Sequence, residues 1–385
     1  MIPHDAYPPG VSVCVPSHDG RGPLTAELLA TFEAARREAS VPVEMIIVDN
    51  AGEPECIELA DRCAKAGATY LRGPREAGAK RNLAARSAKY DTLLFVDSDT
   101  LLTPSSIQAH IEALRAAPED VAGIAGRVVM HGRQSPIWQV LEYSRLHNVC
   151  FDFTDLYREV GWGCTCNLSV RHTAFEEAGG FSERTFTPCG GEDVDLGTRI
   201  SERGYRWITD ASATVLHRRE PLSRWHEIVR KLFTYGCADV FLTNAFPRRR
   251  VFSPNPFAIA LVTAVVTLPL IPLVPAAPAI AVLPPLVALA VDVMRPLDAP
   301  TVYGKAPARF VPQRQTGLRT RVLRVQGALI DSAFDVGVLW ESLRRGRPRL
   351  AFFHFGYTDG DRFVPLDEPG RQGEADTGEV FTCAS

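Results

Sequence analysis

Two aspartates, Asp97 and Asp99, directly follow the apolar run Leu93-Leu94-Phe95-Val96. Such a run predicts a buried strand, and Ser98 and Thr100 favour a turn at its end. Side chains alternate between the two faces of a strand, so both carboxylates can reach one ion only where the strand gives way to a turn. Carboxylates of this kind suit Mg²⁺ or Mn²⁺, with substrate phosphate oxygens completing the coordination. The triplet therefore predicts a metal site at the carboxyl end of a strand.

A lone Asp-x-Asp is also common in solvated turns, so its surroundings have to support a metal site. Two earlier apolar runs, Val11–Val15 and Met45–Val48, also end in polar residues, and helical patterns separate the runs. This alternation predicts βαβ units with a parallel sheet, whose ligands bind beyond the carboxyl ends of the strands. No G-x-G-x-x-G follows the first run, which argues against a dinucleotide-binding domain.

The composition limits the class of protein. The chain has 385 residues, a net charge of −3 and 42 Lys and Arg that are spread along it, so no nucleic-acid footprint is expected. The nine cysteines form no C-x-x-C pair, which favours reduced thiols. Residues 1–10 lack the pattern of a secretory signal. We therefore expect the catalytic part to stay in the cytoplasm.

A long apolar region follows the catalytic part. Between Val251 and Val291 there is no charged residue or histidine. This stretch is about twice as long as the ~20 residues that span a bilayer. Prolines interrupt it, which favours two short membrane spans or a re-entrant hairpin, and the basic flanks place both ends in the cytoplasm. A buried hydrophobic subdomain is the alternative. Residues 224–236 predict a basic amphipathic helix that lies either on an anionic membrane or against the catalytic domain.

A second group of carboxylates lies between Gly179 and His217. It comprises Gly-Gly-Phe at 179–181, Glu-Asp-Val-Asp-Leu at 192–196, Arg199 and a terminal His217. Three further motifs precede them: Asp49-Asn50 at a predicted strand tip, Arg81-Asn82 in a predicted helix, and Asp-x-Asp. In this order of motifs, the chain resembles the family 2 glycosyltransferases of the GT-A fold over about residues 11–236. The segment 224–236 also looks somewhat like that of the mycofactocin-type glycosyltransferases.

The resemblance implies a role for each matching residue on the donor side. Pro16, His18, Asp49 and Asn50 would line the nucleoside pocket, although many relatives carry Asp-Asp where this chain has Asp49-Asn50. Asp97 would lie by the ribose. Asp99 and His217 would hold the metal, although a histidine at a strand end is as often structural. Arg81 would add a cation at the diphosphate.

On the acceptor side, Asp193 is the predicted general base, which removes the proton of the attacking hydroxyl and so implies inversion. Glu192 and Trp162 would contact the acceptor. The alternative for residues 192–195 is an acidic helix start, and the alternative for Trp162 is a core position. Cys164 and Cys166 lack a matching pair, so we do not expect them to bind metal.

These observations predict an α/β GT-A domain with a Rossmann-like, mostly parallel sheet, followed by a membrane-associating region. The expected segments are an extension (1–10), the catalytic domain (11–236), a basic linker (237–256), a hydrophobic hairpin (257–294), a helical region (295–360) and a disordered tail (361–385). The expected activity is metal-dependent transfer of a single sugar from a nucleotide-diphosphate sugar to a hydroxyl acceptor at the cell membrane, since Pro221 stands where processive relatives have Gln. The alternatives are a nucleotidyltransferase and a non-catalytic scaffold. The donor, the acceptor and the oligomeric state do not follow from the sequence.

Overall fold

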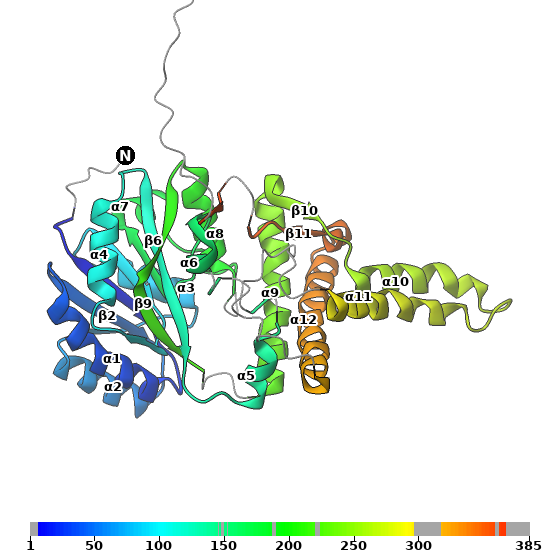
Figure 1. Ribbon diagram of the computed structural model, residues 1–385, viewed down its shortest axis with the longest axis horizontal. Coiled ribbons are helices and arrows are strands. Elements are labelled where there is room, and N and C mark those ends of the chain that lie inside the picture. The colour runs from blue at the N-terminus through cyan, green and yellow to red at the C-terminus, as the bar shows by residue number, and fades with distance from the viewer. Residues whose placement is uncertain are drawn as a thin grey trace, which may run out of the picture.

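The computed structural model describes residues 7–144, 146–147, 150–151, 153–186, 190–219, 224–295, 317–358 and 362–366. Its centre is a mixed sheet in the order β12-β7-β9-β6-β8-β4-β1-β2-β3, with β5 paired to β9 (Figure 1). The strands of this sheet are β1 (Val11–Pro16), β2 (Val43–Asp49), β3 (Thr69–Arg72), β4 (Thr92–Val96), β5 (Thr100–Leu102), β6 (Val121–His131), β7 (Tyr157–Val160), β8 (Asn167–Arg171), β9 (Arg206–Arg218) and β12 (Val364–Pro365).

The first four strands pair in parallel, as the βαβ pattern predicted. The other half of the sheet is mixed: β8 runs antiparallel to β4 and β6, whereas β6 and β9 are parallel. The sheet is therefore mixed but largely parallel, with its antiparallel pairs among the strands from β4 onward. The α/β architecture itself is confirmed.

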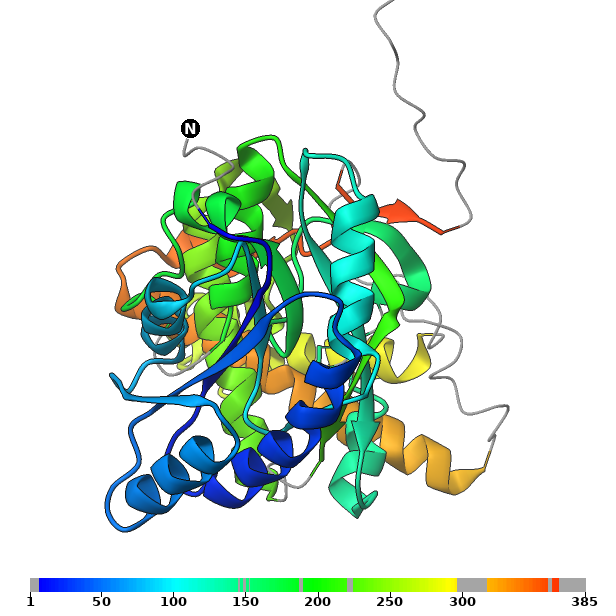
Figure 2. The same cartoon turned by 90° about the vertical axis from the view of Figure 1, so that its left-hand side faces the viewer.

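Helices cover both faces of the sheet, because successive strand residues point to opposite sides. Val13 and Val15 of β1 pack toward one face, whereas Cys14 packs toward the other. The first face is covered by α1 (Gly22–Glu38), α2 (Glu55–Lys65) and α4 (Ser106–Ala116), and the second by α3 (Ala77–Ser87), α7 (His172–Glu177) and α8 (Glu192–Glu202). Figure 2 shows the resulting three-layered domain from its side.

A helical unit stands beside this domain. Its long helices are α9 (Trp225–Ala245) and α12 (Leu318–Arg344), and the short α5 (Pro136–Leu141) packs against them. A Cβ at Gly236 would lie 2.0 Å from the carbonyl oxygen of Phe334, and one at Gly337 would lie 2.1 Å from that of Phe233. The two glycines thus let α9 and α12 cross closely. Of the two placements expected for residues 224–236, the structure has the packed helix.

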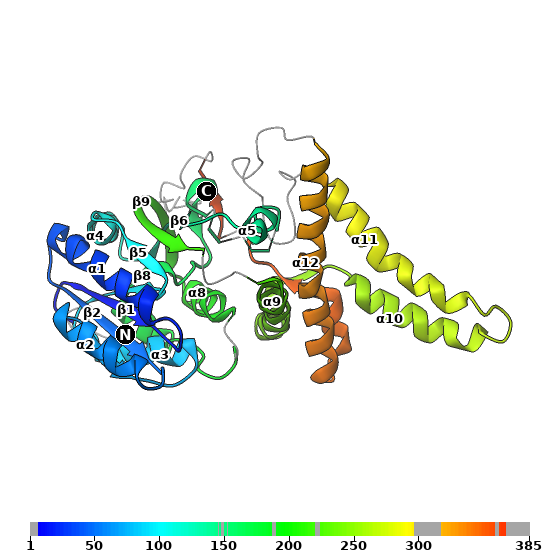
Figure 3. The ribbon, with the colours of Figure 1, turned by 90° about the horizontal axis from the view of Figure 1, so that it is seen from below.

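The apolar region forms a hairpin of α10 (Pro256–Thr267) and α11 (Leu283–Met294), which projects from α12 on the side away from the catalytic domain (Figures 1 and 3). The 3₁₀ turns η3 (Leu268–Leu270) and η4 (Ala277–Val282) belong to its outer part. Among the residues described, no helix combines the length and the apolarity that crossing a membrane requires. The hairpin shape expected for residues 257–294 is present, whereas the structure gives no transmembrane helix.

Buried polar contacts hold the base of the hairpin. Asn255 Oδ1 accepts from the amides of Phe257 and Ala258, which caps α10, and its Nδ2 donates to the carbonyl of Asp335 in α12. Next to it, His354 lies 3.1 Å from Asp239 of α9. His354 belongs to β11 (Phe353–Phe355), which pairs with β10 (Arg250–Phe252) and follows the 3₁₀ turn η6 (Pro348–Phe352). The hairpin is therefore anchored to both long helices.

Two expected segment boundaries differ in the structure. The boundary after residue 236 falls inside α9, so part of the expected linker 237–256 is helix. In the expected tail, β12 pairs with β7, because Phe363 is buried and packs edge-on against Phe153 and Tyr157. The rest of the tail from residue 367 lies outside the described residues. So do residues 1–6 of the extension and 296–316 of the helical region.

Candidate active site

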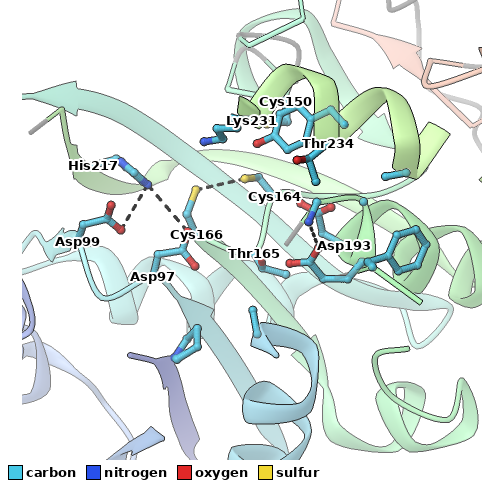
Figure 4. A pocket seen from close by; sticks show the side chains of 18 of the residues that line it. Asp97, Asp99, Cys150, Cys164, Thr165, Cys166, Asp193, His217, Lys231 and Thr234 are labelled. Carbon is cyan, nitrogen blue, oxygen red and sulfur yellow. Dashed lines mark hydrogen bonds and ion pairs between the residues drawn. The ribbon is translucent and has the colours of Figure 1, made fainter. Parts of the chain in front are cut away.

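Asp97, Asp99 and His217 meet at the carboxyl end of β4, where the sequence predicted a metal site. Asp97 and Asp99 follow the last residue of β4, and the pairing of β5 with β9 sets Thr100 opposite His217. His217 Nε2 lies 3.9 Å from Asp97 Oδ2 and 3.7 Å from Asp99 Oδ1 (Figure 4). One ligand atom from each residue lies within 4.8 Å of the other two. Two carboxylates and an imidazole suit a divalent cation such as Mn²⁺ or Mg²⁺.

The charges of this group depend on one another. Burial alone would lower the pKa of His217, but the carboxylates of Asp99 and Asp97 outweigh it and raise the pKa. Burial would likewise raise the pKa of Asp97, whereas the hydrogen bond with His217 and the nearby guanidinium of Arg81 lower it. Asp97 is therefore held as a carboxylate, as metal or ribose binding requires.

Arg21 brings a positive charge to the group formed by Asp97, Asp99 and His217. Its Nη1 donates to Asp99 Oδ2 at 2.6 Å. In the sequence Arg21 stands between two glycines after the first predicted strand, and we expected no role for it. In the structure the turn after β1 brings its guanidinium to Oδ2 of Asp99, whereas His217 Nε2 lies nearest the other oxygen, Oδ1. The signal that could have found it was a lone arginine at the tip of a strand in the same sheet.

Arg81 connects the two carboxylate motifs. From α3 its Nη2 donates to Asp97 at 2.8 Å and its Nη1 to Glu192 at 2.9 Å. The side chain of Arg81 is only 4% exposed. The other oxygen of Glu192 accepts from the amide of Gly190. The arginine that we expected at the diphosphate thus positions both motifs, and Glu192, expected to contact the acceptor, is held by Arg81.

We expect Arg81→Met to lower the free energy of unfolding by about 3–5 kcal/mol, because it leaves two carboxylates without their shared cation. Urea denaturation followed by circular dichroism measures this change. The matched control is Arg86→Met on the same helix, since Arg86 is 62% exposed and makes one surface ion pair, which should be worth less than about 1 kcal/mol. Equal losses in the two variants would refute the bridging role of Arg81.

Asn82, next to Arg81 on α3, binds the backbone of the Gly-Gly-Phe motif at residues 179–181. The side chain of Asn82 accepts from the amide of Phe181 at 2.8 Å and donates to its carbonyl at 2.9 Å. Gly180 has a φ of +68°, and a Cβ there would lie 2.7 Å from Asn82 Oδ1. Only glycine fits easily at such a position. The two motifs therefore fasten the segment before α8 to α3.

Asp193 lies in the first turn of α8, which begins at Glu192 after Gly191 in a left-handed conformation. Its Oδ1 accepts from the amide of Val194, and burial, with the charge of Glu192, raises the pKa of Asp193 well above its usual value. A carboxyl group with a raised pKa is a better proton acceptor when ionised. The helix start expected as the alternative and the predicted catalytic carboxyl group are thus compatible.

One cavity of about 980 Å³ brings the two motifs together. Its walls include Asp97, Asp99 and His217 on one side and Glu192 and Asp193 on another. Figure 4 shows that the carboxylate group, three cysteines and Asp193 lie around the same space. A cavity of this size is large enough for a nucleotide-sized ligand.

The predicted donor-side residues divide into two groups. Pro16, His18 and Asn50 line the cavity, whereas Asp49 is not among its lining residues. Asp49 is fully buried, and its Oδ2 accepts from the amide of Ala51 and the hydroxyl of Tyr70. Its Oδ1 has no hydrogen-bond partner among the described residues. A direct contact of Asp49 with a nucleoside stays a prediction.

Trp162 is mainly a core residue. It is 3% exposed, packs edge-on against Phe153 and donates its indole N–H to the carbonyl of Tyr357. A Cβ at Gly197 of α8 would lie 2.5 Å from its Cβ. Although Trp162 borders the cavity, these contacts favour the packing alternative, and stacking on a sugar stays a prediction.

Three thiols line the cavity between the carboxylate group and Asp193. Cys166 Sγ donates to Cys164 Sγ at 3.3 Å, and Cys150 also donates to Cys164. These hydrogen bonds lower the pKa of Cys164. The sequence singled out Cys164 and Cys166 but not Cys150, because only the fold brings it to them. Among the described residues, the three cysteines do not form a metal-binding group of the kind found at Asp97.

Comparison with known proteins assigns the N-terminal part of the chain. Residues 12–174 match the family model described as glycosyl transferase family 2. This part of the chain is a family 2 glycosyltransferase domain. The match covers β1 to β8 and Asp97 and Asp99, whereas Asp193 and His217 lie beyond it.

Two curated relatives carry glycosyltransferase or related names. An O-antigen biosynthesis protein of Myxococcus xanthus is 29% identical over 56% of this chain and 18% of its own length. An N-acetylglucosaminyl-diphospho-decaprenol L-rhamnosyltransferase of Mycobacterium tuberculosis is 32% identical over 34% of this chain and 47% of its own length. The chain thus spans less than half of either relative.

Among solved structures, a mannosyltransferase from Pyrobaculum calidifontis, in complex with GDP-Man and Mn²⁺, is similar with a TM-score of 0.49 and 17% identity. That similarity covers 89% of this chain and 90% of the other.

Proposed function

We propose that this protein transfers a single sugar from a nucleotide-diphosphate sugar to a hydroxyl acceptor, with inversion at the anomeric carbon and with a divalent metal. The observation that carries the proposal is that Asp97 and Asp99, which follow β4, and Asp193 line the same cavity. The family match supports a glycosyltransferase rather than another nucleotide-dependent enzyme. The reaction takes place at the cytoplasmic surface of the cell membrane.

In this proposal Asp97, Asp99 and His217 would hold a divalent metal, whose charge would stabilise the diphosphate leaving group. Arg21, which donates to Asp99 at 2.6 Å, would turn to the diphosphate when a donor binds. Asn50 lines the cavity, and its Oδ1, which has no hydrogen-bond partner among the described residues, would accept from an N–H or O–H group of a nucleoside. Arg81 keeps Asp97 and Glu192 in place for both substrates.

Asp193 acts as the general base. Its carboxylate accepts the proton of the acceptor hydroxyl while that oxygen attacks the anomeric carbon from the side opposite the diphosphate, which inverts the configuration. The amide of Val194 orients one carboxylate oxygen, leaving the other for the hydroxyl. The name of the mycobacterial relative describes a lipid-linked diphosphate sugar as acceptor; we leave the acceptor here as a glycan, lipid or small metabolite.

A nucleotidyltransferase, the alternative enzyme, would need a glycine-rich phosphate-binding loop after the first strand. The amides of Gly20 and Gly22, which would form it, instead donate to the carboxylate of Glu55 at 2.9 and 2.6 Å. A loop whose amides already bind a carboxylate is poorly placed to bind phosphates. This observation favours the glycosyltransferase over that alternative.

A donor panel tests the proposed function. Purified full-length protein is titrated by calorimetry with UDP-, GDP- and dTDP-sugars, with Mn²⁺, with Mg²⁺ and with EDTA, and hydrolysis of each donor is followed by chromatography. We expect one nucleotide to bind at least tenfold more tightly with metal than with EDTA. Binding of no donor under any condition would refute the proposal and leave the scaffold alternative.

A further inference from the structure

The hairpin of α10 and α11 exposes apolar side chains almost throughout its length. Its large apolar residues between Ile259 and Met294 include many that are 36–82% exposed, with Leu273 near the tip the most exposed. The segment from Val251 to Val291 carries no charge. Its base is anchored through Asn255, so the exposed surface belongs to an ordered element. An exposed apolar surface of this extent marks a docking site for a protein or a membrane.

A second apolar surface runs along α12. Its large exposed apolar residues recur at intervals of three, four or seven positions: Leu318, Val322, Val325, Leu329, Val336, Trp340 and Leu343. This spacing forms one stripe on a helix. The buried residues Phe334 and Val338 belong to a cluster shared with α9. Each stands two positions before a stripe residue, about 200° away around the helix. The stripe therefore faces away from α9.

The hairpin leaves α12 on this same outer side. In Figures 1 and 3 the order is the catalytic domain, α9, α12 and then the hairpin, whose helices run away from α12 rather than along it. If the stripe lay flat on a planar surface, the hairpin would therefore pass through that surface. This is the arrangement of an element lying on a membrane and another entering it.

Arginines flank the stripe at both ends of α12. Arg319 and Arg321 are exposed near its start, and Arg344, Arg345, Arg347 and Arg349 are exposed at and beyond its end. Arg248 and Arg250 lie exposed beside the start of the apolar region. Such a combination of apolar stripe and basic flanks is typical of helices that bind anionic lipid surfaces. The charges favour a bilayer over an apolar protein partner.

We propose that the α10–α11 hairpin inserts into one leaflet of an anionic bilayer while the α12 stripe lies at the headgroup boundary. Each hairpin helix has 12 residues, or about 18 Å, against a hydrocarbon core of ~30 Å. The helix therefore reaches little beyond the bilayer midplane. The hydroxyl of Thr267 donates to the carbonyls of Thr263 and Ala264, which suits a site without water.

This inference says which part of the protein makes the membrane contact of the proposed function. It rests on the proposed function only for the reason why the protein would bind a membrane. Insertion is a property of the hairpin and α12, so it can be tested without donor, metal or acceptor. A failure of donor binding would leave it intact, and a failure of insertion would leave the proposed chemistry intact.

The test is vesicle flotation of detergent-purified, full-length protein after detergent removal. The vesicles contain phosphatidylcholine alone or with about 30% phosphatidylglycerol. We expect flotation with anionic vesicles, at least a tenfold weaker binding for Leu273→Glu at the hairpin tip, and an intermediate loss for Trp340→Glu. Ile57→Glu is the matched control, since Ile57 is an equally apolar, 59% exposed residue on α2 of the catalytic domain, and it should bind like wild type.

Insertion depth is measured with Leu273→Trp, relative to wild type, by fluorescence quenching with brominated lipids. Stronger quenching by bromines deep in the acyl chains than by those near the headgroups is expected. Two results would overturn the proposal. One is equal flotation of wild type and Leu273→Glu. The other is a detergent-free dimer that Leu273→Glu converts to a monomer, without flotation of either form, which would assign the hairpin to a second copy of the chain.

Discussion

Asp99→Asn should lower kcat/KM for glycosyl transfer by about 10²–10³-fold, because it removes one of the two carboxylate ligands and several kcal/mol of stabilisation of the leaving diphosphate. The amide keeps the size of the side chain, but it carries no charge for the cation or for Arg21. The loss should appear in donor binding as well as in turnover. Calorimetry should therefore show that the metal no longer tightens donor binding, whereas the weak, metal-free binding stays close to that of wild type.

The control for this experiment is Asp61→Asn on α2. Asp61 is 60% exposed and pairs with Lys65 in the next turn, so removing its charge should change kcat/KM by less than about twofold. A metal-dependent increase in donor affinity that survives in Asp99→Asn would contradict the site at Asp97, Asp99 and His217. If His217→Gln kept the metal-dependent increase in donor affinity while Asp99→Asn lost it, the metal site would consist of the two carboxylates without His217.

The local part of this site was predictable from the sequence. An apolar run that ends in Asp-Ser-Asp places the carboxylates at a strand tip, and the acidic residues 192–195 offered a helix start as an alternative to a catalytic role. Both predictions hold because they depend on nearest neighbours, on the burial of one strand and on the favourable position of carboxylates at a helix N-terminus. The resemblance to family 2 glycosyltransferases added the order of the motifs; the family match confirms the family over residues 12–174, whereas the motifs from Gly179 onward lie beyond it.

The connections between these motifs could not be predicted in the same way. Arg81 was assigned to a diphosphate, because an arginine in isolation shows only its charge. The structure shows that this charge is already shared by Asp97 and Glu192. Likewise, Arg21 reaches Asp99 across the turn after β1, and Cys150 reaches Cys164 through the packing of a loop. Each contact joins positions far apart in the chain, for which spacing carries no signal.

The C-terminal region shows the same limit. Its composition indicated a hairpin, and the hairpin is present. The pattern of residues 224–236 was ambiguous, since an amphipathic helix hides its apolar side equally well against a protein or a membrane. The close crossing at Gly236 and Gly337 decides for protein contact. The exposed stripe belongs instead to α12, whose three-to-four spacing became informative only when the structure showed which side α9 covers.

Asp193→Asn should lower kcat by about 10²–10⁴-fold while leaving metal-dependent donor binding unchanged, since a general base acts on the acceptor and not on the donor. Burial and Glu192 raise the pKa of Asp193, and only the ionised form accepts a proton. Wild-type kcat/KM should therefore rise with pH through this raised pKa and level off above it, and the Asn variant should lose that rise. Glu202→Gln, an exposed change on the same helix, should keep both the rate and the pH profile. If Asp193→Asn retained the wild-type pH profile at a reduced rate, Asp193 would be a positioning residue, and the proton would have to pass to another group in the cavity.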